Sequence, residues 1–322
     1  MRWNDRIGRR LKLSDLHILL AVAQCGSMAK AARQLAMSHP VVSRAIGELE
    51  RTLGVPLLER NPHGVELTAF GRAMLARSHA AFDELRQGVK DIEFLADPTA
   101  GEVRVGSSVI IGSSLVAAIV DRLSREYPRI TVHLLASEAA LAYRALEERD
   151  VEVVIAGLFG PVTRENMTAE ILYEDPFVVA AGARNPWCQR RRIKLSELME
   201  EPWALPPRDS PTGPMVVDLF RGRGLDLPRA ALIASSIPAR NAMLANGRFL
   251  TMVPTSVVKL AGRKGDIRAL PVDIPKVGRP IGIVTLKKRA LSPVAQLFVG
   301  AAREVASSMS KPTNVLKRAS HF

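Results

Sequence analysis

The sequence predicts a protein of α/β class overall, with an all-α N-terminal head, one long helix and a C-terminal α/β half. Three observations support this prediction. Apolar residues recur at helical spacing as far as Ala96, and residues 97–101, Asp-Pro-Thr-Ala-Gly, then interrupt the pattern. Beyond Gly101, short apolar runs alternate with helical patterns. Such alternation is typical of βαβ units with a mainly parallel sheet.

Composition indicates two or three domains and argues against several classes of protein. The chain has 322 residues, of which 47% are hydrophobic. No apolar run approaches the roughly 18–20 residues of a membrane span, and the N-terminus lacks the apolar core of a signal peptide. We therefore expect a cytoplasmic protein. Cys25 and Cys188 form neither a disulfide framework nor a metal cluster, so we expect no metal and no cofactor.

The net charge of +13 suggests an anionic partner but does not locate its binding site. Residues 1–70 carry 10 basic and 6 acidic side chains, whereas residues 102–322 carry 31 basic and 21 acidic ones. Most of the excess charge therefore lies outside the N-terminal head.

Two helical patterns meet at a turn within the head. The apolar stripe of the first contains Met28, Ala31, Ala32 and Leu35, and that of the second contains Val42, Ile46, Leu49 and Leu53. Ser38 is a good N-cap for the second helix, and Pro40 falls in its first turn. The opposite face carries small and polar groups, namely His39, Pro40, Ser43, Arg44 and Gly47. A recognition helix needs such a front, although an ordinary amphipathic surface helix would show it too.

The surrounding segments extend this unit. Ser14 opens an earlier helix that Gly26 ends, and Gly54 ends the third helix. Two short extended pieces around the loop 61–64 predict a β-hairpin wing.

Residues 11–75 resemble the winged helix-turn-helix of LysR-type transcriptional regulators. The resemblance rests on an ordered set of residues: Leu16, Leu19, Leu20, Val22, Ala23, Gly26, Ser27, Ala31, Ala32, Leu35, Ser38, Val42, Ser43, Ile46, Leu49, Glu50, 53–60, Leu67, Thr68 and Gly71. It implies a DNA-binding domain over residues 1–69. His39, Val41 and Gly47 differ from residues that are common in the family, so the operator sequence does not follow from the resemblance.

The resemblance and side-chain chemistry together imply roles at DNA. Ser38, Ser43 and Arg44 are candidates for phosphate or base-edge hydrogen bonds, and His39, Pro40 and Val41 face the groove. Lys30 and Arg33 are expected to contact phosphates. On the wing, we expect contacts from Arg60, Asn61 and His63.

Residues 70–101 predict a linker helix and hinge. A coiled-coil seam follows the apolar residues Leu75, Phe82, Leu85, Val89 and Ile92. This stripe could dock onto the chain's own domain, but it shows no obvious intrachain partner. The resemblance implies that it forms a dimer.

Strands are expected near residues 103–106, 130–135, 151–157, 171–181, 231–234, 249–253, 267–270 and 281–286. Helices are expected near 115–126, 139–148, 214–221, 238–245, 255–261 and 293–307, with a Gly/Ser-rich loop over 107–114. This half resembles the family's effector-binding domain, which has two lobes and a periplasmic-binding-protein-like fold. The resemblance implies an effector domain over 102–308, with lobe I at about 102–174 and 276–308, lobe II at about 175–275, and a loose tail at 309–322.

Ligands of open α/β sheets bind at the carboxyl ends of strands. Candidate effector-binding residues there are Ser107, Ser108, Ser137, Arg208, Ser210 and Thr212. A single loop serine is more often a helix cap than a ligand, but these residues converge on one predicted crevice. The arginine and hydroxyls favour a small anionic metabolite, such as a sugar acid or an aromatic acid.

Three other functions compete with a ligand-responsive regulator. An enzyme is disfavoured because the histidines are scattered and no nucleophile elbow or phosphate loop is present. A solute-binding protein would lack the DNA-binding head. A constitutive DNA-binding protein would not need a two-lobed domain. We expect a dimer of dimers that binds an imperfect palindrome, bends it and alters access of RNA polymerase.

Overall fold

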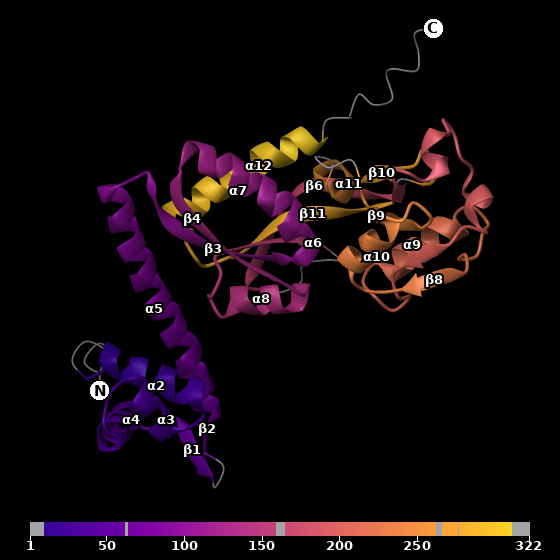
Figure 1. The fold of residues 1–322 in the computed structure, drawn as a ribbon. Helices are drawn as coiled ribbons and strands as arrows, with labels where there is room; N and C mark the ends of the chain where they lie inside the picture. Colours follow the sequence, from indigo (N-terminus) through magenta and orange to yellow (C-terminus); the bar gives the residue numbers. More distant parts are fainter. Residues whose placement is uncertain (1–9, 62–63, 159–164, 262–265, 276, 311–322) are drawn as a thin grey trace. The chain divides into compact units, whose positions relative to one another are not determined.

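A computed structural model describes residues 10–61, 64–158, 165–261, 266–275 and 277–310 (Figure 1). Intrachain contacts divide the chain into two compact units, with the boundary between Val89 and Lys90. The head unit contains helices α2 (Leu13–Cys25), α3 (Met28–Gln34) and α4 (His39–Leu53), followed by the hairpin of β1 (Leu58–Asn61) and β2 (Gly64–Leu67). The predicted winged helix-turn-helix is therefore present.

Glycines end two of the head helices where the sequence predicted. Gly26 follows α2 with φ 62° and Gly54 follows α4 with φ 76°, a conformation that glycine adopts at little cost. Ser38 precedes α4 as expected, but its side chain makes no capping hydrogen bond. Glu50 instead fastens the chain after α4, because its Oε1 accepts hydrogen bonds from the Leu57 and Leu58 backbone N–H groups at 2.8 and 3.1 Å.

The long helix α5 (Ala69–Ala96) corresponds closely to the predicted linker helix. Its first half packs on the head, where Leu75 and Phe82 lie against the apolar core formed by α2, α3 and α4. The expectation that the whole stripe lacks an intrachain partner is therefore wrong for these two residues. Leu85, Val89 and Ile92 are exposed, Ile92 by 69%.

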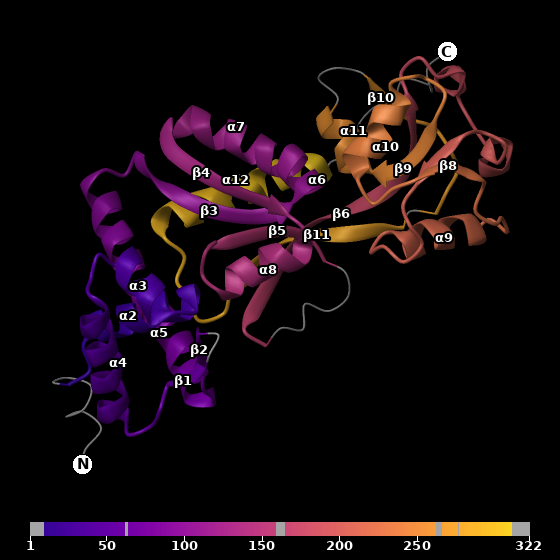
Figure 2. The ribbon, with the colours of Figure 1, turned by 60° about the horizontal axis from the view of Figure 1, so that its bottom comes forward.

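A nine-stranded sheet forms the second unit (Figure 2). Eight strands follow the order β4-β3-β5-β11-β6-β9-β7-β8, and β10 pairs with β6. Their bounds are β3 Ala100–Ser108, β4 Arg129–Ser137, β5 Val153–Gly157, β6 Met167–Gly182, β7 Trp203–Leu205, β8 Ala230–Ile233, β9 Leu250–Pro254, β10 Ile267–Ala269 and β11 Gly278–Leu286.

The sheet is mixed rather than mainly parallel. Strands β4, β3 and β5 pair in parallel, as do β8, β7 and β9. Strands β6 and β11 are antiparallel to each other and to their other partners. The long strand β6 therefore joins two parallel groups, and the sequence pattern did not distinguish its direction from that of its neighbours.

Helices cover both parallel groups. They are α6 Val109–Ile111, the π-helix Gly112–Val116, α7 Ala117–Glu126, α8 Ala139–Glu147, α9 Gly213–Arg221, α10 Ile237–Leu244, α11 Thr255–Ala261 and α12 Pro293–Ser310, with 3-10 turns at Pro186–Gln189 and Leu195–Leu198. Around β3, β5 and β11, one apolar core includes Ile119, Phe298 and Ala302, and around β7 and β9 another includes Trp203, Leu219 and Phe220.

The expected Gly/Ser-rich loop over 107–114 is wrong. Ser107 and Ser108 end β3, and the chain then turns at once into α6 and the π-helix. Glycine and serine are weak helix formers, which is why the sequence suggested a loop. Tertiary packing overrides that preference, since Ile111, Leu115 and Val116 are at most 4% exposed.

Candidate functional site

The N-terminal part of α4 presents the polar front that the sequence predicted. Val42, Ile46 and Leu49 are at most 1% exposed and anchor the helix to the head core. Ser38, His39, Pro40, Val41 and Arg44 are exposed, and Ser43 is half-buried. The helix therefore offers a hydroxyl, an imidazole, a guanidinium and an apolar branched side chain from its first two turns.

Further cations lie on α3. Lys30 and Arg33 are exposed, and neither they nor Arg44 form an ion pair with any described residue. Cations without acidic partners at the front of a helix pair can neutralise phosphates, while the first turns of the second helix reach base edges.

On the wing, the neighbouring strand holds the side chain of Asn61. Asn61 ends β1, and its Nδ2 donates to Glu66 Oε1 at 2.7 Å, so the amide is positioned by the neighbouring strand. Arg60 lies in β1 beside Val65. His63, the third predicted wing residue, lies outside the described residues.

The carboxyl ends of β3 and β4 bring the lobe I serines together. Ser107 pairs with Ala136 and Ser108 with Ser137 in the parallel register. The Ser107 hydroxyl is buried and donates to the Ser108 carbonyl at 3.1 Å, and Ser137 Oγ donates to the Glu138 carbonyl at 3.2 Å. Ser108 Oγ is buried with no partner among the described residues. Of these hydroxyls, Ser108 is thus the one left without a hydrogen bond.

The predicted residues of lobe II follow β7. Ser210 Oγ donates to the Pro207 carbonyl at 2.6 Å and accepts from the Gly213 N–H at 3.1 Å, so this hydroxyl stabilises the turn before α9. Arg208 is exposed, and Thr212 precedes α9 without a capping bond. The structure therefore gives Ser210 a local structural role.

Sequence reasoning missed Arg240, which lies in α10 and is 1% exposed. One of its terminal nitrogens donates to the Ala234 carbonyl at 2.6 Å, while Nε has no partner among the described residues. Burial lowers the pKa of Arg240 to about 10. The only sequence signal was an arginine in a short apolar helix, which usually indicates an exposed position.

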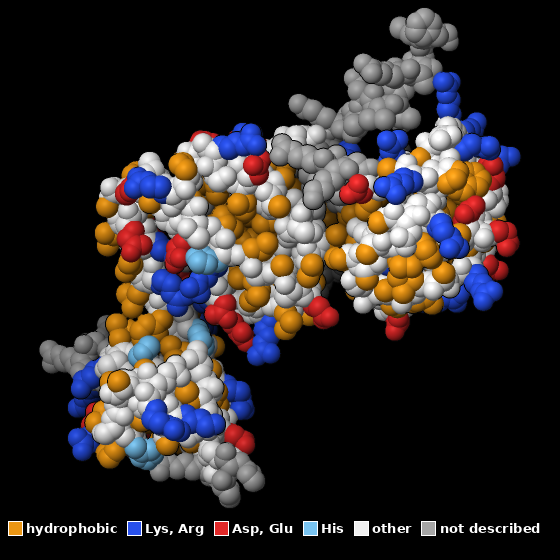
Figure 3. Space-filling view, in the orientation of Figure 1, with side chains coloured by type: hydrophobic (Ala, Val, Ile, Leu, Met, Phe, Trp, Pro, Cys, Tyr) orange, Lys and Arg blue, Asp and Glu red, His pale blue; other side chains and the backbone are white. Residues whose placement is uncertain are grey.

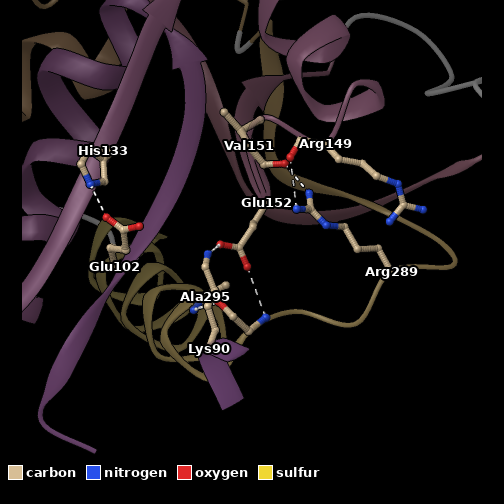
Figure 4. Close-up of polar contacts among 9 residues, drawn as sticks. Lys90, Glu102, His133, Arg149, Val151, Glu152, Arg289 and Ala295 are labelled. Atoms are coloured by element: carbon tan, nitrogen blue, oxygen red, sulfur yellow. Dashed lines mark hydrogen bonds and ion pairs between the residues drawn. The ribbon is translucent and has the colours of Figure 1, made fainter. Parts of the chain in front are cut away.

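A buried ion pair joins the end of α5 to the α/β sheet (Figure 4). Lys90 Nζ lies 2.5 Å from Glu152 Oε1, and Glu152 Oε2 accepts from the Ser292 N–H at 3.3 Å. Burial raises the pKa of Glu152, but the hydrogen bonds from Lys90 and Ser292 outweigh it and hold this pKa below its usual value. Arg289 donates to the carbonyls of Val151 and Arg149 at 2.5 and 3.3 Å.

A second buried cluster lies where β6 pairs with β11. Asp175 accepts hydrogen bonds from the Ser256 N–H at 3.0 Å and from its hydroxyl at 2.6 Å, and Arg279 faces Asp175 in the strand register. Burial raises the pKa of Asp175, an effect that Ser256 and Arg279 partly offset. These contacts brace the point at which the chain passes between the two parallel groups of strands.

The described residues contain neither a membrane-spanning helix nor a group of metal ligands. None of their helices is long and apolar enough to cross a membrane. None of their His, Cys, Asp and Glu side chains gather into a group that could hold a metal ion.

The chain combines a winged head that has an exposed helix front with a mixed α/β domain. This combination defines a helix-turn-helix DNA-binding regulator. The chain belongs to the LysR family of bacterial transcriptional regulators, since residues 13–72 match the bacterial regulatory helix-turn-helix protein, lysR family, and residues 96–307 match the LysR substrate binding domain. It is thus a transcription regulator and not an enzyme.

Its relatives span almost the whole chain. The uncharacterized HTH-type transcriptional regulator YdcI of Escherichia coli is 23% identical over 304 residues, covering 94% of this chain and 99% of that protein. The transcriptional dual regulator GltC of Bacillus subtilis is 24% identical, covering 89% and 95%. The crystal structure of CbnR, a LysR family regulator, aligns with TM-score 0.55 at 25% identity over 91% of this chain and 100% of that one.

CbnR has also been solved in complex with its target DNA, and this structure aligns with TM-score 0.54 at 25% identity, covering 92% of this chain and 100% of that one. Full-length OxyR from Pseudomonas aeruginosa aligns with TM-score 0.64 at 21% identity, covering 92% and 94%, and shares the fold.

Proposed function

We propose that this regulator binds an imperfect palindrome as a dimer of dimers and alters transcription when a small anionic metabolite binds its effector domain. The observation that carries the DNA-binding part is the front of α4, where Arg44 is exposed without an ion pair beside small groups, with Lys30 and Arg33 on the preceding helix. The proposed DNA contacts are those of Lys30, Arg33, Ser38, His39, Pro40, Val41, Ser43, Arg44, Arg60, Asn61 and His63.

Direct reading of bases would come from the first turn of α4. His39 and Val41 differ in chemistry, because the imidazole can bond to a base edge whereas the valine contacts a thymine methyl. Lys30 and Arg33 would position the head on the backbone without reading sequence. On the face shown in Figure 3, basic side chains lie on both units, and most of the excess positive charge belongs to residues 102–322, so bulk charge does not mark the DNA-binding face.

Dimerisation is proposed through α5. Beside the start of this helix, the head unit has an apolar groove of about 670 Å³, lined by residues that include Leu16, Leu53, Phe70 and Met74. Leu85 and Val89 are exposed on the later part of α5. A second copy of α5 would remove these side chains from water, and apolar burial is the usual driving force for such association.

The effector domain is proposed to span 102–308, with the head at 1–69 and the linker at 70–101. Ser107, Ser108 and Ser137 are the last residues of β3 and β4, and Arg208 and Thr212 follow β7, so all five lie near the carboxyl ends of parallel strands, where such sheets bind ligands. Effector binding would change the angle between the lobes. The packing of the tetramer would carry that change to the heads, which would alter the DNA bend and the access of RNA polymerase. We place this activity in the cytoplasm, where DNA is accessible.

An electrophoretic mobility shift assay with the promoter regions flanking the protein's own gene tests the proposed function. Arg44→Ala should weaken binding by about 5- to 150-fold, the loss of about 1–3 kcal/mol that one good contact contributes. Arg51→Ala is the matched control, since Arg51 lies on the same helix with its side chain 74% exposed and pairs with Glu48. Equal affinities of the two variants would contradict the assignment of the α4 front.

A further inference from the structure

Two buried polar atoms without partners belong to elements at the strand ends proposed to hold the effector. Ser108 Oγ lies at the carboxyl end of β3, and Arg240 Nε belongs to the helix that follows β8. Neither atom has a hydrogen-bond partner among the described residues. Buried polar groups are nearly always paired in native proteins, so an orphan calls for a physical explanation.

The guanidinium of Arg240 is placed at the end of β8 by its own contacts. It donates to the carbonyl of Ala234, and the Ala234 N–H in turn donates to the Leu205 carbonyl at the end of β7 at 3.0 Å. The loop that carries Arg208 and Thr212 starts directly after Leu205. Arg240 is therefore at the same strand ends as the predicted lobe II residues.

Helix α6 of lobe I packs against the same apolar cluster as helix α10 of lobe II. Ile110 of α6 and Ile237 in the first turn of α10 pack on one apolar cluster, together with Leu244, Val253 and Val257. Ser108 lies two residues before Ile110, and Arg240 three residues after Ile237. The two unpaired groups therefore belong to elements of the two lobes that share this apolar cluster.

The charge of Arg240 is also uncompensated. It forms no ion pair with any described residue, and its one hydrogen bond is to a neutral carbonyl. A guanidinium keeps its proton even when buried, and a buried unpaired charge is unfavourable by several kcal/mol. An anion is the partner that would compensate it, and a carboxylate or phosphate matches the planar fork of an arginine.

We propose that Arg240 is the anion-binding residue of the effector site and that the effector is a small carboxylate or phosphate compound. This inference rests on the proposed function, which places an effector at these strand ends. Arg240, and not Arg208, is then the main determinant of affinity for the anion. Arg208 is exposed, and an exposed guanidinium gains less from pairing with an anion than a desolvated one.

Thermal unfolding of the full-length protein, followed by tryptophan fluorescence, tests this proposal. Trp187 and Trp203 both lie in lobe II, and Trp203 is fully buried. The probes are sodium succinate, sodium benzoate and sodium phosphate, each compared with sodium chloride at the same ionic strength. At about ten times its Kd, a binding anion should raise the melting temperature of the parent protein by about 3–6 °C.

Arg240→Met keeps the length of the side chain and removes its charge. Without any anion, this variant should melt about 2–4 °C above the parent, because an uncompensated buried charge is gone. It should also lose the response to the anion that stabilises the parent. Arg221→Met is the matched control, because Arg221 is exposed in the last turn of α9 and is not one of the proposed effector-binding residues, and it should keep that response.

The outcomes separate this proposal from the proposed function. A parent protein that responds to none of the three anions, an Arg240→Met variant that melts below the parent, or one that keeps the full anion response would each overturn the role of Arg240. DNA binding by the Arg240→Met variant in the mobility shift assay is expected to persist. Loss of DNA binding by the parent protein would contradict the proposed function and would leave the thermal result standing.

Discussion

Lys90 and Glu152 provide the clearest energetic prediction at the scale of single residues. The Glu152 side chain is 3% exposed and its carboxylate bonds both Lys90 and the backbone of Ser292. Lys90→Met leaves that carboxylate buried without its cation, which should lower the free energy of unfolding by about 3 kcal/mol. Urea denaturation followed by circular dichroism measures this loss.

The control for Lys90→Met is Arg125→Met, which breaks the exposed pair of Arg125 with Asp121. Exposed pairs within a helix contribute about 0.3–0.5 kcal/mol. Equal losses in the two variants would show that the Lys90–Glu152 pair does not anchor the end of α5.

The same pair predicts a pH dependence. The pKa of Glu152 is lowered in the folded protein, so its contribution to stability is present above the ordinary value of 4.5 and is lost as pH falls through the folded value. The stability difference between the parent and Lys90→Met should therefore shrink from pH 7 to pH 4. Urea unfolding of both proteins at the two pH values checks this, and an unchanged difference would contradict it.

Sequence patterns located some site residues and not others for identifiable reasons. The front of α4 was predictable because periodicity places Val42, Ile46 and Leu49 on one face and so fixes the other. The local bonds of Ser210 and the burial of Arg240 were not predictable. Both depend on tertiary packing, the first on the turn before α9 and the second on the docking of α10 against the sheet.

Two glycines give a prediction at the scale of helices. Gly47 lies inside α4, and a Cβ there would meet nothing within 4 Å. Gly47→Ala should stabilise the protein by about 1 kcal/mol through helix propensity. Gly71 lies in the first turn of α5, where a Cβ would be 2.0 Å from the Leu57 carbonyl oxygen.

Gly71→Ala should therefore destabilise the protein by about 1–3 kcal/mol, because α5 must shift away from the backbone of Leu57. Urea unfolding followed by circular dichroism compares the two variants with the parent. A loss of stability in Gly47→Ala similar to that in Gly71→Ala would contradict the description of α4 as an exposed-front helix.

The bounds of helices and strands were predicted best where a single sequence pattern determined them. Helix α5 was expected at residues 70–96 and spans Ala69–Ala96, because its apolar stripe is long and Pro98 stops it. The π-helix at Gly112–Val116 was missed, since its glycine and serines favour a loop until Leu115 and Val116 are buried. Strand directions were missed because a buried strand shows the same apolar run in either orientation.

At the scale of the whole molecule, the dimer interface proposed on α5 would decide whether two heads act together. Leu85→Lys with Val89→Lys would place two charges on the exposed stripe, 50% and 54% exposed in the single chain. We expect light scattering after gel filtration to show a monomer instead of a dimer or tetramer. Affinity for a two-half-site operator should fall by about 100-fold or more, because the second head then binds without the benefit of tethering.

The matched control for this double variant is Leu141→Lys, which changes a residue of α8 that is 53% exposed. It should keep the parent's mass and operator affinity, since α8 is not part of the proposed interface. A double variant with unchanged mass would mean that the α5 stripe is not the dimer contact. An unchanged operator affinity in a monomeric double variant would instead mean that one head is sufficient for recognition, which contradicts the proposed binding to a palindrome.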